Sequence, residues 1–323
     1  MTVRLIAAAV LLAPLIGGCT STSAQAGSSL TLYTCASANV EQAVVAGFEK
    51  AHAGAKVTVF RAPTGQLNAR VAADQRAGGI KADVIWACDP LTMHGYDAQG
   101  LLRAWSPANA ADIPRAYRTA HFTGIDLLYL TVVTRTGVQP PTSWADLAKP
   151  EYRNRVALPN PSFAASALGL LGYLAATPGY GLDYFRQLKR NGAVQLSAPA
   201  DTLTGVAQGK YLTGVTLANA AYAAQRKGSP ITVSWPRPGA AAIYAPIGVT
   251  TRKGLSPMAT RFADYAASRA AQTIMAGQDT YPTLPGIDGP PIPPGSPIAQ
   301  PDWPSLFDSY RSVLAEYVSV FGN

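Results

Sequence analysis

The chain has 323 residues, of which 48% are hydrophobic and 14% are charged, and its formal net charge is +8. This composition excludes a disordered chain, and the length favours two lobes over one compact core. The basic residues are scattered, with no run of lysines and arginines interleaved with aromatic residues, so the sequence favours anionic surroundings or ligands and argues against nucleic-acid binding.

The N-terminus has the pattern of a lipoprotein export signal. Arg4 precedes the apolar run LIAAAVLLAPLI, which is too short for a comfortable membrane span but suits the apolar region of a signal peptide. The run ends in LIGGC, which resembles the lipobox at which bacteria cleave the chain before a cysteine and attach lipid to it. We therefore expect a signal peptide over residues 1–18, lipid on Cys19, a flexible tether over residues 19–28, and an extracytoplasmic protein anchored to the bacterial cell membrane. An ordinary secretory signal with an incidental cysteine is the alternative.

Strands and helices alternate through the first third of the chain. Apolar runs predict buried strands, and apolar residues at helical spacing, such as Val40, Val44 and Phe48, predict helices. In chain order the segments are the strand SLTLYTCAS, the helix ANVEQAVVAGFEKAHAG, the strand AKVTVFRA, the turn and helix PTGQLNARVAADQRAGG, the strand ADVIWACD and the short helix PLTMHGYDAQGLL. This alternation predicts a parallel sheet with crossover helices.

A second α/β unit follows. The predicted segments are the strand DLLYLTVVTR, the short helix, turn and strand SWADLAKPEYRNRVALPNP, the helices SFAASALGLLGYLAAT and GLDYFRQLKRNG, and the strand, helix and strand AVQLSA, DTLTGVAQGK and LTGVTLAN. The run AAIYAPIGVTTRKG predicts a long strand that returns to the first lobe. An amphipathic helix, SPMATRFADYAASRAAQTIMAG, then leads into an irregular arm rich in proline and glycine over residues 281–301, and WPSLFDSYRSVLAEYVSVF predicts a final helix.

The order of these segments resembles a known family. LTLYTCASANVEQAVVAGFEKAHAGAKV, ADVIWACDPLTMHGYDAQGLL, SWADLAKPEYRNRVALPNP and YAPIGVTTRKG are similar to landmarks of the extracellular solute-binding proteins of bacterial ABC importers, in the branch that binds ferric iron, 2-aminoethylphosphonate, sugar phosphates and thiamine. The resemblance covers most of the chain after about residue 28. It implies the α/β fold of a two-lobed, type II periplasmic binding protein, in which each lobe is a mostly parallel sheet flanked by helices and the ligand lies between the lobes. It also implies a membrane permease as partner. Lobe 1 would comprise residues 29–122 and 248–323, and lobe 2 residues 123–247.

The ligand site is expected where strands turn into helices beside the cleft. Parallel sheets bind ligands beyond the carboxyl ends of their strands, where helix N-termini offer free N–H groups that suit anions. Hydroxyl groups gather at several of these turns, although each hydroxyl has an equally plausible role as a helix cap. The candidate ligand residues are Thr34, Ser37, Thr64, Gly65, Asp89, Ser162, Ser166, Asn219, Tyr222 and Tyr244. The aromatic residues Tyr33, Trp86 and Phe163 are expected in the core instead.

Binding of ferric iron, either directly or as an iron chelate, is the sharpest alternative, and direct coordination can be tested against the residues. The resemblance implies two adjacent tyrosines as phenolate ligands, yet Ala220 and Ala221 stand at those positions and Tyr222 is the nearby phenol. The implied histidine and glutamate positions correspond to Ser37 and Cys88. The three histidines are not paired in a zinc-binding spacing, so the sequence predicts no metal and no cofactor.

Cys35 and Cys88 remain once Cys19 is assigned to lipid. An even pair in an oxidising compartment is a disulfide candidate. In the family's sheet order the first and third strands are neighbours, so the resemblance implies a bridge between these two cysteines. A distant alternative is a Cys-dependent hydrolase with Cys35 as nucleophile, although no histidine is placed as its base.

These observations predict a binding protein that makes and breaks no bonds. We expect a monomer that captures a small solute by closure of its lobes, most readily an anion such as a phosphonate, phosphate ester or carboxylate, and delivers it to a permease.

Overall fold

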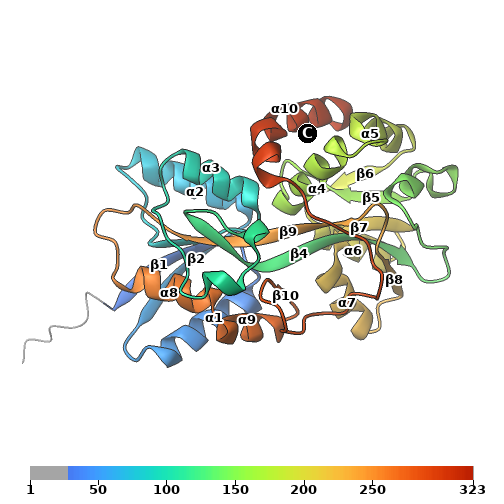
Figure 1. Ribbon diagram of the computed structural model, residues 1–323. Helices are drawn as coiled ribbons and strands as arrows, with labels where there is room; N and C mark the ends of the chain where they lie inside the picture. Colours follow the sequence, from blue (N-terminus) through green and yellow to red (C-terminus); the bar gives the residue numbers. More distant parts are fainter. Residues whose placement is uncertain (1–27, 323) are drawn as a thin grey trace, which may run out of the picture.

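The computed structural model describes residues 28–322, and its strands form one 11-stranded sheet (Figure 1). The predicted signal peptide, Cys19 and nearly all of the tether lie outside the described residues. The strands follow one another in the order β2-β1-β3-β9-β4-β7-β5-β6, with β8 and β10 also paired to β4 and β11 paired to β9. Helices cover both faces of the sheet (Figure 1).

The elements have these bounds. The strands are β1 (Ser29–Thr34), β2 (Lys56–Arg61), β3 (Val84–Trp86), β4 (Phe122–Arg135), β5 (Val156–Pro159), β6 (Val194–Leu196), β7 (Thr213–Leu217), β8 (Ile231–Ser234), β9 (Ala240–Val249), β10 (Tyr281–Pro282) and β11 (Ile298–Ala299). The α-helices are α1 (Ala38–Ala51), α2 (Thr64–Arg76), α3 (Pro90–Ala98), α4 (Ala165–Ala176), α5 (Gly181–Arg190), α6 (Pro199–Ala207), α7 (Ala218–Arg226), α8 (Met258–Ala267), α9 (Arg269–Ala276) and α10 (Trp303–Phe321).

Two long strands join the halves of the sheet. β1 pairs in parallel with β2 and β3 on one side, and β5 pairs in parallel with β6 and β7 on the other. β4 and β9 run antiparallel to each other between these groups; β9 pairs with β3, and β4 pairs with β7. The predicted fold class is confirmed, and the long strand expected over residues 241–254 is β9.

A β-bulge interrupts the pairing of β4 with β9. The register shifts between Gly124 and Asp126, opposite Pro246 and Ala245. Proline has no N–H to donate, so a bulge is a tolerated place for Pro246 in the middle of a sheet. A side chain on Gly124 would collide with Tyr244, since a Cβ there would lie 2.8 Å from that ring. Bulges re-aim the side chains that follow them, and here Asp126 and Leu128 share one face of β4.

The amphipathic helix predicted over residues 256–277 is wrong in one respect. It is divided into α8 and α9 at Ser268, whose backbone is extended and whose side chain accepts a hydrogen bond from the amide of Ala271. Serine competes with helical hydrogen bonding in this way and serves well as an N-cap. Helix α7 and strand β8 were not predicted, because α7 follows β7 directly without a turn residue between them.

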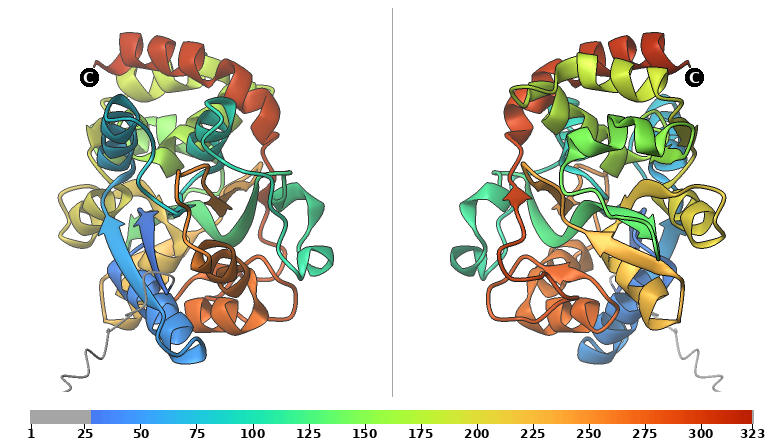
Figure 2. Two further views of the ribbon diagram at one scale, coloured as in Figure 1. Left: turned by 90° about the vertical axis from the view of Figure 1, so that its left-hand side faces the viewer. Right: turned by 90° about the vertical axis from the view of Figure 1, so that its right-hand side faces the viewer.

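The final helix reaches both groups of parallel strands. α10 packs against α4 and α5 and also against α3 (Figure 2). The division drawn from the sequence assigned α10 to lobe 1, whereas its contacts lie with helices assigned to both lobes. Within residues 28–322, no helix combines the length and apolar character needed to cross a membrane.

Candidate functional site

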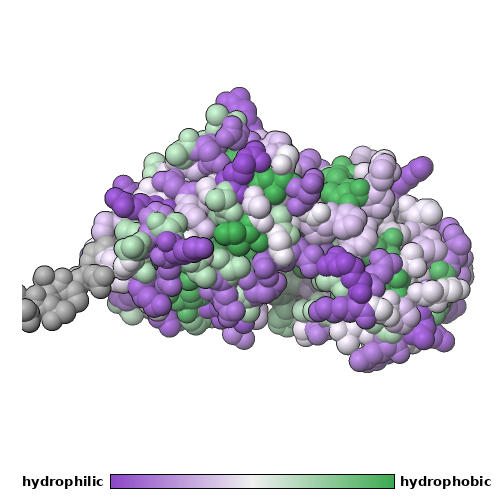
Figure 3. Space-filling model, turned by 90° about the horizontal axis from the view of Figure 1, so that it is seen from below, coloured by the Kyte–Doolittle hydropathy of each residue, from purple (hydrophilic) through white to green (hydrophobic). Residues whose placement is uncertain are grey.

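A cavity of about 560 Å³ lies between the two groups of parallel strands. A volume of this size is typical of sites for small molecules. The face seen in Figure 3 is hollowed between the two halves of the molecule. The lining residues are Cys35, Ala36, Ser37, Val40, Arg61, Pro63, Thr64, Trp86, Cys88, Asp126, Leu128, Phe163, Ala164, Ala165, Ser166, Ser197, Ala198, Pro199, Leu217, Asn219, Ala245 and Thr280.

The starts of several helices meet at this cavity. α1, α2, α4, α6 and α7 each place residues of their first turn or cap in its wall. No N-cap side chain of these five helices accepts a hydrogen bond from the first turn. At α6, however, the Asp201 carboxylate accepts a hydrogen bond from the Ala198 amide at 3.0 Å. Outside the cavity wall, the N-cap side chains of Asp89 at α3, Ser268 at α9 and Asp302 at α10 do accept bonds from the first turn. The first amides of a helix have no partner within it, so these starts offer N–H donors and a positive dipole end.

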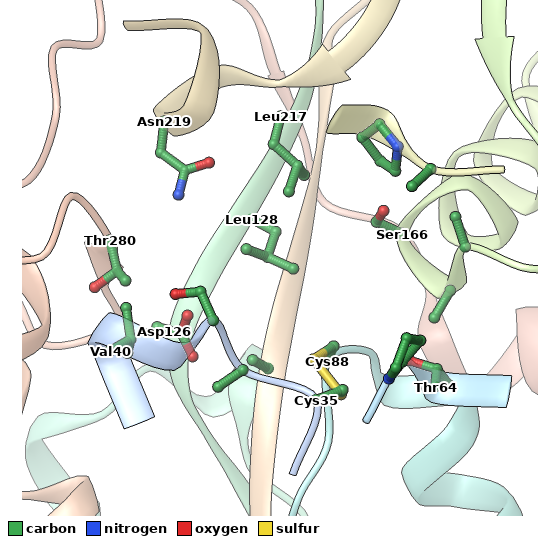
Figure 4. A pocket seen from close by; sticks show the side chains of 18 of the residues that line it. Cys35, Val40, Thr64, Cys88, Asp126, Leu128, Ser166, Leu217, Asn219 and Thr280 are labelled. Carbon is green, nitrogen blue, oxygen red and sulfur yellow. A yellow bond between two sulfur atoms is a disulfide. The ribbon is translucent and has the colours of Figure 1, made fainter. Parts of the chain in front are cut away.

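A disulfide holds two of the strand ends together at the floor of the cavity. Cys35 and Cys88 are joined, with their Cα atoms 5.9 Å apart. They follow β1 and β3, which are neighbours in the sheet. Figure 4 shows the bridge in the cavity wall. In this state Cys35 has no free thiol, which removes the nucleophile that a Cys-dependent hydrolase would use.

Two sides of the cavity differ in their chemistry (Figure 4). Thr64 and Ser166, at the starts of α2 and α4, lie on one side, which we call the helix-start end. Asp126, Asn219 and Thr280 lie on the opposite side, which we call the acceptor end. Each end receives residues from distant parts of the chain, so both depend on the complete fold.

Asp126 is the acidic residue of the cavity wall. It is 5% exposed, and its Oδ1 atom is buried without a hydrogen-bond partner among residues 28–322. Burial raises the pKa of this carboxyl group to about 7. The indole N–H of Trp86, also in the cavity wall, is a buried donor without a hydrogen-bond partner among the described residues. Oδ1 of Asn219 and Oγ1 of Thr280 are likewise buried without a partner in the described chain. The acceptor end therefore presents hydrogen-bond acceptors that the protein itself does not satisfy.

The structure brings four of the ten candidate ligand residues to the cavity. These are Ser37, Thr64, Ser166 and Asn219. Ser37 is exposed and Thr64 half-buried, whereas Ser166 is buried. Their contact with a ligand stays a prediction.

Two other candidates, Thr34 and Asp89, have roles within the fold. The Thr34 side chain is fully buried, and its Oγ1 accepts a hydrogen bond from the amide of Ala36 at 3.0 Å. Asp89 accepts from the amide of Thr92 at 2.8 Å and so caps α3, while burial raises its pKa. Both residues therefore serve local structure beside the cavity rather than in its wall.

Tyr222 and Tyr244 also lie outside the cavity wall. Tyr222 accepts a hydrogen bond from the indole N–H of Trp235 at 2.9 Å. Tyr244 is 2% exposed and packs near Gly124. Gly65 and Ser162 are exposed and are absent from the wall.

Sequence reasoning missed Arg61, Asp126 and Thr280. Arg61 ends β2, the position equivalent to the turns that were considered. Asp126 opens the predicted strand DLLYLTVVTR, directly before the apolar residues LLYL, and a carboxylate at the start of a buried strand is a signal that could have identified it. The prediction that Phe163 belongs to the core is wrong, since it is 59% exposed at the cavity wall, while Tyr33 and Trp86 are buried as expected.

The arrangement does not present a cluster typical of a metal site. Among residues 28–322, no group of three or more His, Cys, Asp and Glu side chains could hold a metal ion. The charged residues of the cavity wall are Arg61 and Asp126.

The sequence profile of bacterial extracellular solute-binding proteins matches residues 30–278. The chain belongs to this family. The predicted resemblance is thus confirmed, and the protein is the solute-binding component of an ABC importer. None of the curated proteins matches the sequence significantly.

Solved structures of similar fold include several solute-binding proteins. Iron-bound HitA from Pseudomonas aeruginosa superimposes with a TM-score of 0.80 at 18% identity, covering 90% of this chain and 99% of its own. AfuA from Actinobacillus pleuropneumoniae with bound fructose-6-phosphate gives a TM-score of 0.80 at 18% identity, covering 90% and 98%. The substrate-binding protein of an ABC transporter from Agrobacterium tumefaciens gives 0.74 at 16% identity, covering 91% and 96%. At such identities the likeness establishes the fold of this solute-binding protein and leaves its solute open.

Proposed function

We propose that this solute-binding protein captures a small anionic solute, such as a phosphonate, phosphate ester or carboxylate, in the cavity between its two lobes. The observation that carries the proposal is the convergence on one cavity of four helix starts without a capping side chain, those of α1, α2, α4 and α7. Such starts bind anions through their free amides, and each favourable helix–charge interaction contributes roughly 0.3–1 kcal/mol. Arg61 adds a positive charge at the cavity wall.

Closure of the lobes follows from the distribution of these groups. The start of α2 belongs to the group of β1, β2 and β3, and the starts of α4 and α7 belong to the group of β5, β6 and β7. An anion that contacts both groups at once gains most when they approach, so it shifts the population toward a closed state. We keep the lobe assignment of residues 29–122 with 248–323 and of residues 123–247, with α10 as a helix that contacts both.

A thermal-shift screen tests the anion proposal. The probes are ethylphosphonate, glycerol 3-phosphate, propionate and citrate, with sodium chloride at matched ionic strength as the control. A ligand at about 100 times its dissociation constant stabilises the native state by about 2.7 kcal/mol, which raises the melting temperature by several degrees. If no anion exceeded the chloride control while a neutral or cationic solute did, the proposal would be refuted.

Iron binding is the competing proposal, since the similar structures include iron-bound HitA and the ferric ion-binding protein A of Pasteurella haemolytica. Ferric citrate added to the protein would then produce the visible absorption of a tyrosinate complex, centred on Tyr222. The Tyr222 hydroxyl already accepts a hydrogen bond from Trp235, so we expect no such band. A band that disappears in Tyr222→Phe would establish the iron proposal instead.

We further propose that the mature protein is a monomer, is anchored through lipid on Cys19, works with membrane permease subunits and catalyses no reaction. Mass spectrometry of the membrane-extracted protein would detect the acyl groups on Cys19, and Cys19→Ser would release the protein from the membrane. Alkylation of the native protein without reductant should leave Cys35 unmodified, because it is joined to Cys88. Labelling of Cys35 that abolished a hydrolytic activity of the native protein would contradict the absence of catalysis.

A further inference from the structure

A buried carboxyl group lies in the wall of the cavity that we assign to an anionic solute. Asp126 is 5% exposed, and its Oδ1 atom has no hydrogen-bond partner within residues 28–322. No ion pair of the described residues includes Asp126. A carboxylate that is neither solvated nor paired costs free energy, so this position favours the neutral acid.

The position of Asp126 is fixed by the sheet. It lies on β4 directly after the bulge, opposite Ala245 of β9 on one side and Pro282 of β10 on the other. Pairing with two strands means that rigid elements hold the carboxyl group, rather than a loop. Ala245 and Thr280 line the same cavity, so a solute in this part of the cavity lies against Asp126.

Hydrogen-bond donors lie around Asp126. Figure 4 shows Val40, in the first turn of α1, and Asn219, in the first turn of α7, on the side of the cavity that holds Asp126. Neither helix has a capping side chain. The indole N–H of Trp86, buried in the same wall, can only donate and has no partner within residues 28–322. Free amides and an unpaired indole N–H suit an acceptor, so the anionic group of a solute fits beside Asp126.

Two negative charges that share one buried site disfavour each other's ionisation. We propose that Asp126 meets the anionic group as a neutral carboxylic acid and donates its proton in a hydrogen bond to a solute oxygen, so that above neutral pH each captured solute takes up one proton from solvent. The inference rests on the proposed function, because it requires an anion in the cavity. The carboxylate gains the proton, the solute keeps its negative charge, and no covalent bond of the solute changes. Once Asp126 is protonated, its hydroxyl, the amide of Asn219 and the hydroxyl of Thr280 can all donate.

Glu41 is the rival source of proton uptake. It lies in the first turn of α1, is buried, and is absent from the cavity wall. Burial raises its pKa, and Arg61 opposes that shift. Arg61 is the other charged residue of the wall, and it is exposed. The positive charge of the wall therefore acts on Glu41, whereas Asp126 has no charged partner.

The remaining titratable groups near this part of the cavity are neutral or have partners. Burial raises the pKa of the tyrosines on α7, β9 and β10, which are Tyr222, Tyr244 and Tyr281, so they stay neutral. Asp89 accepts a hydrogen bond at the start of α3. Asp279, directly before Thr280, is paired with Arg226 at 2.7 Å.

The affinity for an anion should therefore depend on pH. Burial raises the pKa of Asp126 to about 7, so the empty cavity holds a neutral acid below that pH and a carboxylate above it. A bound anion raises this pKa further. Anion binding should be tightest below about pH 7 and should weaken by up to about tenfold for each pH unit above it.

Titration calorimetry at about pH 6 and about pH 8.5 tests the inference. The probes are the four anions of the thermal-shift screen: ethylphosphonate, glycerol 3-phosphate, propionate and citrate. Asp126→Asn is neutral at every pH, so it should bind these anions about tenfold more tightly than the native protein at the higher pH and equally well at the lower pH. Titrations at the higher pH in buffers of different ionisation enthalpy give the protons taken up per solute. The native protein should take up about one more proton than Asp126→Asn, a difference in which ionisation of the solute itself cancels.

Two variants are the controls. Asp112→Asn removes an exposed carboxylate outside the cavity wall, and Glu41→Gln removes the rival buried one, so both should keep the pH dependence of the native protein. Should Asp126→Asn fail to fold, Asp126→Ser removes the same charge with a smaller side chain and should show the same loss of pH dependence.

Three results would overturn the inference and leave the anion proposal intact. They are an affinity of the native protein that does not change with pH, a pH dependence that survives in Asp126→Asn, and a pH dependence that is lost in Glu41→Gln. Absence of binding by all four anions at both pH values would refute the anion proposal and the inference with it.

Discussion

The two ends of the cavity are built from different parts of the protein. The helix-start end takes its donors from backbone amides, which the fold supplies whatever side chains are present. The acceptor end takes its atoms from the side chains of Asp126, Asn219 and Thr280. Substitutions at the first end should therefore change affinity in small steps, because most donors are backbone groups. Substitutions at the second end should change which solute is preferred, because single side chains carry it.

The disulfide between Cys35 and Cys88 stabilises the strand ends at the cavity, and its removal should have the largest effect on stability. The double substitution Cys35→Ser with Cys88→Ser removes a bridge that spans 53 residues of chain. Closing a loop of this length stabilises the native state by about 4 kcal/mol in the chain-entropy model. We expect the free energy of unfolding measured by urea titration to fall by an amount of this order.

The same double variant shows whether the disulfide also shapes the cavity wall. Both cysteines line the cavity and the start of α1 follows Cys35, so local loosening should weaken binding of ethylphosphonate beyond what stability alone explains. Binding that stays unchanged at temperatures where the variant is folded would restrict the bridge to a role in stability.

The titration of Asp126 at the acceptor end should make the free energy of unfolding depend on pH. The pKa of Asp126 is about 7 in the folded protein and about 3.9 in an unfolded chain. The folded state binds the proton of this carboxyl group more tightly than the unfolded state, so protonation of Asp126 adds to the free energy of unfolding. This contribution is complete below about pH 4 and is lost as the pH rises through about 7. The loss amounts to at most about 4 kcal/mol. Asp126→Asn should remove it, so the variant should be more stable than the native protein above neutral pH.

Urea titrations of the native protein and of Asp126→Asn across this pH range give the difference between their free energies of unfolding. Contributions from groups that titrate in both proteins cancel in this difference. Asp112→Asn should follow the native protein throughout. A native protein and Asp126→Asn variant with parallel stability profiles would show that the carboxyl group titrates at its ordinary pKa.

The contrast between the two ends also explains what the sequence could predict. The helix-start end follows from the alternation of strands and helices, and Ser37, Thr64 and Ser166 were placed correctly in the turns that reach the cavity. Thr34 and Asp89 occupy the same kind of turn but serve as local hydrogen-bond acceptors. A turn specifies which residues are near, while the direction of each side chain depends on backbone angles that periodicity does not report.

The acceptor end depends on contacts that no local pattern contains. Asp126 reaches the cavity because a bulge forms opposite Pro246, more than a hundred residues away in the sequence. Thr280 comes from the short segment between α9 and β10, which lay between the predicted helix of residues 256–277 and the predicted arm of residues 281–301. A carboxylate at the start of a buried strand was the one signal available, and its partners could be found only in the folded chain.

Arg61 is an exposed, positively charged residue of the cavity wall. Arg61→Gln should weaken ethylphosphonate binding by about three- to fivefold, because an exposed charge contributes only about 0.2–1 kcal/mol to a pairing. The effect should shrink as salt is added, since exposed charges are screened. Arg76→Gln, an exposed arginine at the far end of α2, is the matched control and should leave the affinity unchanged. Equal losses in both variants would assign the effect to net charge instead of to the cavity.

The smallest effect is expected at Ser37, and it separates the two roles of a serine at a helix start. Ser37 precedes α1 without accepting a hydrogen bond from its first turn, whereas Ser268 accepts from Ala271 at the start of α9. Loss of a working cap costs about 1 kcal/mol. Ser268→Ala should therefore lower the free energy of unfolding by that amount and leave binding intact, while Ser37→Ala should cost little stability and weaken binding by about twofold to threefold. A Ser37→Ala variant with native affinity and reduced stability would make Ser37 a cap, and α1 would then contribute to the cavity through its backbone amides alone.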